Sequence, residues 1–95
     1  MIFEWDTEKE RRNRAKHRIT FSVALKVFSD PLLALIPDRV GDDGEQRWHA
    51  IGYAAGVQPM LLVVHVYRRS HDGEEIIRII SARKARKGEG RRYFE

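Results

Sequence analysis

The stretch Met60–Arg69, MLLVVHVYRR, decides how this chain folds. Every position from Leu61 to Val64 is apolar, without the alternation that marks a strand with one face in water. Such a continuous apolar run is typical of a strand that is buried on both faces. We therefore predict that Met60–Arg69 is the central strand of a sheet.

Further strand patterns lie on both sides of this stretch. They are separated by turn residues at Gly41–Gly44, at Gly56 with Pro59, and at Asp72-Gly73, which supply the positive or fixed φ that a chain reversal needs. Connections this short predict that consecutive strands pair antiparallel, as a meander. The predicted strands are Leu32–Ile36, Arg47–Ala54, Met60–Arg69 and Glu75–Ala82.

The N-terminal third predicts a strand and two helices. Ile2–Trp5 is short and apolar, and Asp6 or Thr7 can cap a helix over Glu8–His17, whose single apolar residue marks it as a charged surface helix. A second helix follows Thr20 or Ser22 and ends before Pro31. Its predicted core-facing stripe, at i, i+3, i+4 and i+7, is Phe21, Ala24, Leu25 and Phe28.

Composition limits the classes of protein. Ninety-five residues, 42% of them apolar, fit one α+β domain spanning residues 1–95. The chain has no cysteine, so a disulfide framework or Cys-based zinc site is excluded and a reducing cytosol is the natural location. The N-terminus is charged where a signal peptide is apolar, and the apolar run Met60–Val64 is too short to span a bilayer. We expect a soluble, cytoplasmic protein without membrane contact.

Charge points to an anionic partner. The net charge is +4 and the pI is about 9.8. Residues 76–95 contain seven Arg or Lys against two Glu, a net charge of +5, whereas residues 30–45 contain one Arg against five Asp or Glu, a net charge of −4. The positive charge is therefore concentrated at the C-terminal end, where Ser81–Tyr93 can form a short helix that Gly88 and Gly90 each weaken by about 1 kcal/mol relative to Ala.

The run Arg78–Lys87, RIISARKARK, is the strongest candidate for chemistry. A guanidinium binds phosphate through two parallel hydrogen bonds and can stabilise the added charge of a pentavalent transition state, so Arg78 and Arg83 are candidate catalytic residues. Regular strand alternation predicts that these two side chains lie on opposite faces. The alternative for the end of the run is a solvated basic tail.

Proton transfer near neutral pH requires a histidine or a carboxylate. His65 lies in the most apolar strand, so it is either a hydrogen-bonded core residue or a proton carrier. No pair of histidines has the spacing or the acidic companions of a metal site, and we expect neither a metal ion nor a cofactor.

Aromatic residues beside cations are candidates for binding RNA. Trp48 lies between an arginine and a histidine, and it either stacks on a base, worth about 1–3 kcal/mol, or packs in the core. Tyr67, which precedes two arginines, either closes a sheet edge or contacts RNA. The predicted RNA-binding residues are Arg47, Trp48, Arg68, Arg69, Lys84 and Arg86.

The segment Arg78–Ala85, RIISARKA, is the most specific of several motifs that occur in order along nearly the whole chain. The others are Phe3–Asp6, Asn13 with Lys16-His17, Phe21 with Ala24, Val27–Pro31, and Arg47 before Ile51-Gly52. Together they resemble the BrnT family of bacterial toxins. Two positions depart from that pattern. Arg18 stands where glycine usually follows Lys-His, which requires either a strained turn or a different turn, and Gly88–Gly90 interrupts a helix that is usually charged.

This resemblance implies a RelE-like α+β fold, with the N-terminal strand and two helices packed on an antiparallel sheet. It also implies a metal-independent endoribonuclease that inhibits translation when free. In such a reaction the ribose 2′-hydroxyl attacks the adjacent phosphorus. Arg83 and Arg78 are then the residues that stabilise charge, and His65 or Glu45 is the residue that moves protons.

The same resemblance implies two partners besides the RNA substrate. A BrnA-like antitoxin with a ribbon-helix-helix domain is expected to silence the toxin in a hetero-oligomeric complex, and operator DNA is expected to be bound only through that antitoxin. Two alternatives remain open: a non-catalytic module that binds RNA or DNA, and a protein-interaction domain whose basic face meets an acidic partner.

Overall fold

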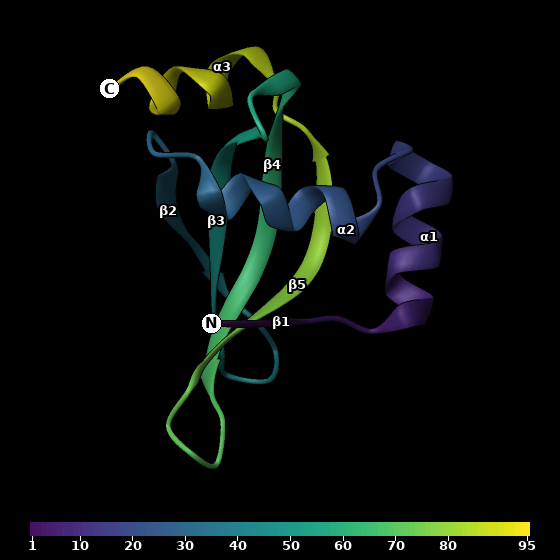
Figure 1. The fold of residues 1–95 in the computed structure, drawn as a ribbon, viewed down its shortest axis with the longest axis vertical. Coiled ribbons are helices and arrows are strands. Elements are labelled where there is room, and N and C mark those ends of the chain that lie inside the picture. The colour runs from purple at the N-terminus through teal and green to yellow at the C-terminus, as the bar shows by residue number, and fades with distance from the viewer.

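A five-stranded sheet forms the centre of the structure, a computed structural model that describes residues 1–95 (Figure 1). The middle strand of the sheet is β4, where Leu61, Leu62 and Val63 are at most 3% exposed. The prediction of a buried central strand is therefore confirmed. In spatial order the strands are β1 (Ile2–Glu4), β5 (Glu75–Lys84), β4 (Val57–Arg69), β3 (Gln46–Ala54) and β2 (Ala34–Val40).

The sheet is mixed. Each of the strands β2 to β5 pairs antiparallel with the next, but β1 pairs parallel with β5, with Ile2 opposite Ile76 and Glu4 opposite Arg78. The expectation of a wholly antiparallel sheet is therefore wrong for β1. No hairpin joins β1 to its neighbour, and the long connection through the helices permits the parallel direction.

Two helical segments follow β1. Helix α1 (Thr7–His17) is capped by the carboxylate of Asp6, which accepts hydrogen bonds from the backbone N–H groups of Glu8 and Lys9. Thr20 caps α2 (Phe21–Ala24), which continues as the 3₁₀-helix η1 (Leu25–Ser29) across one face of the sheet (Figure 1). No helix in the protein has the length and apolar character needed to cross a membrane.

The core-facing stripe of α2 and η1 differs from the predicted one. Phe21, Ala24 and Val27 are completely buried, whereas Leu25 and Phe28 are only partly buried. A 3₁₀-helix has three residues per turn, so the next residue after Ala24 that faces the core is Val27, three positions later. These side chains pack against Ala50, Ala54, Leu61, Val63, Ile79 and Ala82 of the sheet.

Helix α1 protects the edge of β5 beyond the reach of β1. The buried Asn13 amide donates to the Ala82 carbonyl at 2.8 Å, and its oxygen accepts from the Ala82 N–H at 3.1 Å. One side chain thus satisfies both backbone groups that a neighbouring strand would otherwise pair. The rest of α1 is mostly exposed and charged, as the sequence predicts.

The C-terminal helix begins later than the sequence predicts. β5 continues through Ser81 to Lys84, because these residues pair with β4. The helical turns that follow are α3 (Lys87–Gly90) and η2 (Arg91–Phe94). Tyr93 anchors them, since its ring packs edge-on against Tyr53 at 5.3 Å and its hydroxyl donates to Asp30 at 3.1 Å.

Candidate active site

The face of the sheet opposite α2 and η1, named here the open face, carries several of the predicted arginines. Directly opposed residues of an antiparallel pair project on the same side. Arg78 lies opposite Val66 and Arg83 lies opposite Leu62, and these two β4 residues point away from the core side of that strand. Both arginines therefore project from the open face, which points away from the viewer in Figure 1.

A β-bulge in β5 brings the two arginines to the same face. Ser81 lies opposite Val64 and Ile79 lies opposite His65, so Ile80 has no partner on β4. One extra residue reverses the alternation beyond it. The expectation that Arg78 and Arg83 lie on opposite faces is therefore wrong.

Two residues of β3 complete the open face. Arg47 and His49 project from it because Trp48, between them, points to the helix side. His49 lies opposite Val64 of β4, midway between Val66 and Leu62, which lie opposite Arg78 and Arg83. At about 3.3 Å per residue along β4, Val66 and Leu62 are about 13 Å apart.

Carboxylates hold the arginines at one end of the open face. Glu4 accepts from Arg78 at 3.2 Å and lies 3.6 Å from Arg68, and Arg68 binds Glu45 through two hydrogen bonds of 2.6 and 3.1 Å. These hydrogen bonds from Arg68 lower the pKa of Glu45. Glu45 is thus better suited to positioning Arg68 than to accepting a proton at neutral pH.

Arg83 is held by the C-terminal segment. Its guanidinium donates to both carboxylate oxygens of Glu89, at 2.8 and 2.7 Å, and the two side chains are 23% and 25% exposed. Hydrogen bonds from Arg83 lower the pKa of Glu89 to about 2. Glu89 also accepts from the Arg86 backbone N–H, so the same carboxylate closes the first turn of α3.

His49 forms an acid–base pair that the sequence analysis missed. Its Nε2 atom lies 3.1 Å from the Asp38 carboxylate, and both side chains are roughly one-quarter to one-third exposed. Ile36 lies opposite His49, and Asp38 follows Ile36 at strand alternation, so the regular part of the β2–β3 register places Asp38 and His49 on the same face. The only sequence signal for this pair was the turn at Gly41–Gly44, which predicts that β2 and β3 lie side by side.

The open face is a surface rather than a deep cavity. Of the four hollows in the structure, none is lined by Arg47, His49, Arg78 or Arg83. No three His, Asp or Glu side chains are grouped so that they could hold a metal ion. What the face offers is a set of guanidinium forks around a His–Asp pair, an arrangement suited to an extended polyanion.

A comparison with protein families matches residues 5–89 to the family described as "Ribonuclease toxin, BrnT, of type II toxin-antitoxin system". The chain belongs to the BrnT family. It is therefore a ribonuclease toxin of a type II toxin–antitoxin system, with RNA as its target and an antitoxin as its partner. A comparison with individually curated proteins found no match.

In this BrnT-family chain His65 lies away from the open face. It is completely buried on the helix side, edge-on to Phe28 at 4.8 Å and to Tyr67 at 4.9 Å. Burial lowers its pKa to about 4, and its Nε2 atom has no hydrogen-bond partner. This placement favours the core role of His65 over proton transfer to a substrate.

The remaining predicted RNA-binding residues do not join the open face. Trp48 is half-buried and packs against Tyr67 at 6.1 Å, Arg69 donates to the Gly73 carbonyl at 2.9 Å, and Lys84 pairs in register with a core-side residue. Arg86 is exposed after the end of β5. Of that set, only Arg47 and Arg68 accompany Arg78 and Arg83.

Proposed function

We propose that the open face binds an RNA strand and cleaves it without a metal ion, and that this cleavage inhibits translation. The single observation that carries the proposal is the grouping of four arginines and a His–Asp pair on the face of the sheet opposite α2 and η1. The family's description as ribonuclease toxins supplies the substrate class.

Arg78 and Arg83 hold the RNA backbone. Arg83 binds both carboxylate oxygens of Glu89, in the way in which it would bind a phosphate, and Arg78 donates a single hydrogen bond to Glu4. An incoming phosphate therefore replaces an acidic side chain without requiring a new arginine geometry. Once bound, the arginines stabilise the charge that develops on the phosphorane oxygens. Arg47 and Arg68 extend the cationic surface.

His49 is the proton carrier in this proposal. Asp38 at its Nε2 atom holds the imidazole in one orientation, as a carboxylate does for a catalytic histidine, and leaves Nδ1 for the substrate. The base takes the proton of the 2′-hydroxyl while that oxygen attacks phosphorus. The bond to the 5′-oxygen breaks, this oxygen takes a proton from water as it leaves, and His49 then releases its own proton to solvent. The products are a 2′,3′-cyclic phosphate and a 5′-hydroxyl.

The partner is part of the same proposal. We expect a BrnA-like ribbon-helix-helix antitoxin that forms a hetero-oligomer with the toxin and carries it to operator DNA. Relationship to RelE-like toxins and a cytoplasmic location also belong to the proposal, and the +5 charge of residues 76–95 supports an acidic contact surface on the partner.

Cleavage of labelled RNA by the purified chain in EDTA tests the proposal. We expect multiple turnover, cyclic-phosphate ends, and resistance of a substrate with 2′-deoxyribose at the scissile nucleotide. Loss of cleavage in EDTA, or cleavage of the deoxy substrate, contradicts the mechanism. Bound but uncleaved RNA would identify a non-catalytic binding module.

A further inference from the structure

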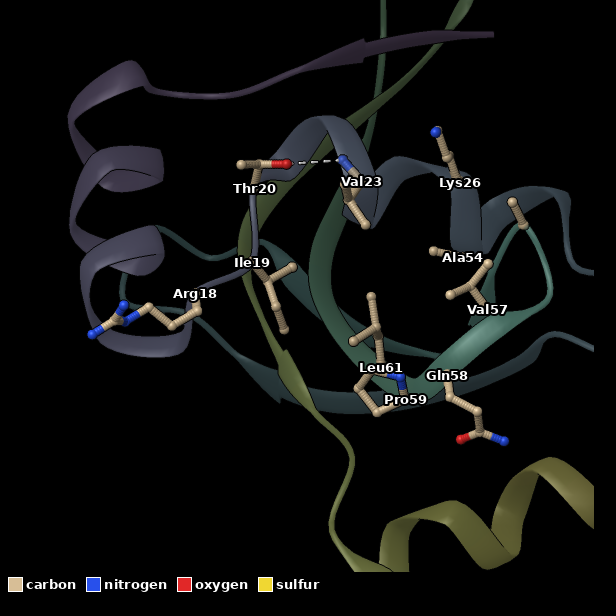
Figure 2. A pocket seen from close by; sticks show the side chains of 11 residues that line it. Arg18, Ile19, Thr20, Val23, Lys26, Ala54, Val57, Gln58, Pro59 and Leu61 are labelled. Atoms are coloured by element: carbon tan, nitrogen blue, oxygen red, sulfur yellow. Dashed lines mark hydrogen bonds between the residues drawn. The ribbon is translucent and has the colours of Figure 1, made fainter.

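A second surface, on the helix side of the sheet, lies apart from the open face. It is a groove of about 410 Å³ between the turn after α1, helix α2 and the β3–β4 hairpin (Figure 2). Ile19, Val23 and Leu61 line it together with Val57, which is 63% exposed, and Val23 is 43% exposed. Isolated apolar side chains are common on surfaces, but a concave group of them indicates a contact.

The rim of the groove is cationic. Arg18 and Lys26 lie on opposite sides of it in Figure 2, and neither forms a salt bridge. No Asp or Glu is among the lining residues. The groove therefore combines an apolar floor with uncompensated positive charge, which is complementary to a segment that carries both apolar and acidic side chains.

Backbone strain is concentrated at this groove. Arg18 and Ala55 are the only non-glycine residues with positive φ, at 62° and 52°, and both line it. Arg18 ends α1 in the left-handed conformation that glycine adopts most easily. Of the two alternatives for Arg18, the structure therefore has the strained turn. An uncommon backbone conformation at a non-glycine residue motivates a hypothesis of function for the Arg18 side chain.

Two other occupants fit the groove less well. The groove is lined by 11 residues, of which 6 are hydrophobic and only Arg18 and Lys26 are cationic, whereas a nucleic-acid backbone is held mainly by cationic side chains. A second copy of this chain would bring its own net charge of +4 toward the cationic rim. A protein segment with acidic residues satisfies both the floor and the rim.

We propose that this groove holds an acidic segment of the antitoxin, with an apolar side chain on its floor and carboxylates beside Arg18 and Lys26. This inference rests on the proposed function, because one of its tests measures RNA cleavage. The existence of an antitoxin follows from membership of the family. Because the groove lies on the helix side, anchoring of the antitoxin is separate from coverage of the open face. A toxin with a damaged groove therefore cleaves RNA but escapes neutralisation.

Binding measurements with the purified antitoxin encoded beside the toxin gene test this inference. Val57→Asp and Lys26→Glu place negative charge in the groove, and we expect each to weaken the affinity by about tenfold to a hundredfold. The matched controls are Leu32→Asp, at a residue 64% exposed outside the groove, and Lys9→Glu on α1. We expect both controls to bind within about threefold of the wild type.

Arg18→Gly gives a test in which stability and binding change in opposite directions. Glycine relieves the positive φ, so the Tm should rise by a few degrees. Removal of the rim charge should at the same time weaken antitoxin binding by about fivefold or more. A residue that matters only for the fold would not show this combination.

The groove variants should cleave RNA at the wild-type rate. Unchanged antitoxin affinity in both Val57→Asp and Lys26→Glu would overturn the inference. So would a loss of RNA cleavage with intact antitoxin binding, which would assign the groove to RNA, or a dimer of the wild-type chain that Val57→Asp dissociates. If the wild type cleaves no RNA, the proposed function fails, but the affinities still decide the role of the groove.

Discussion

Replacement of His65 by Leu should flatten the pH dependence of stability. His65 is completely buried, and burial lowers its pKa from 6.5 to about 4. Between these values the unfolded chain binds a proton that the folded chain does not, so stability falls as the pH falls from 6.5 to about 4. The whole shift corresponds to about 3 kcal/mol, of which about 2 kcal/mol is lost between pH 7.5 and pH 5.

Urea unfolding followed by tryptophan fluorescence at pH 7.5 and pH 5 measures this loss. The lower pH stays above the range in which most carboxylates titrate. Burial also lowers the pKa of His17, which contributes in the same direction, so His17→Gln measures its share. Equal losses of unfolding free energy in the wild type and in His65→Leu would refute the reasoning and return His65 to the candidates for proton transfer.

Three further substitutions test the fold and the site. Asn13→Ala should lower the unfolding free energy by about 1–3 kcal/mol, because it leaves two buried backbone groups of β5 unpaired; a loss below about 0.5 kcal/mol would contradict the edge role. Val27→Ala should lower the unfolding free energy by about 2 kcal/mol, because Val27 is completely buried, whereas Leu32→Ala, at an exposed residue, should lower it by less than about 0.5 kcal/mol. Equal losses in urea unfolding would contradict the assignment of Val27 to the core. Arg83→Ala should reduce kcat/KM for RNA by about 10²–10³, whereas Glu89→Gln, which breaks the same ion pair but keeps the arginine, should not; similar losses would assign Arg83 to holding α3.

Local patterns in the sequence predicted most of the elements of the fold. The apolar run Leu61–Val64 identified the central strand, and Gly44, Gly56 and Gly73 mark the three hairpin turns with positive φ. The direction of β1 could not be predicted in this way, because it depends on a pairing across more than 70 residues of chain. The helical periodicity of the sequence also did not predict the change from α-helix to 3₁₀-helix after Ala24.

In the candidate site too, local sequence predicted the residue types, whereas their positions depend on strand pairing. The sequence identified Arg78 and Arg83 as chemically suited to phosphate, but their common face results from the bulge at Ile80, which leaves no periodic signal. His65 was a candidate proton carrier because it interrupts an apolar strand. That strand is the middle one of the sheet, so His65 is buried. The pairing of His49 with Asp38 could not be predicted, because the sequence alone does not give the register of β2 against β3.

The most direct test of the open face is a comparison of kcat/KM for RNA cleavage in EDTA between His49→Ala and His65→Leu. Both variants remove a histidine from adjacent strands, but only His49 projects from the open face. We expect His49→Ala to lose about 10²–10⁴ in rate, the usual contribution of a general base, and folded His65→Leu to remain within about threefold of the wild type. A large loss in His65→Leu together with an unchanged rate in His49→Ala would contradict the placement of the active site on the open face.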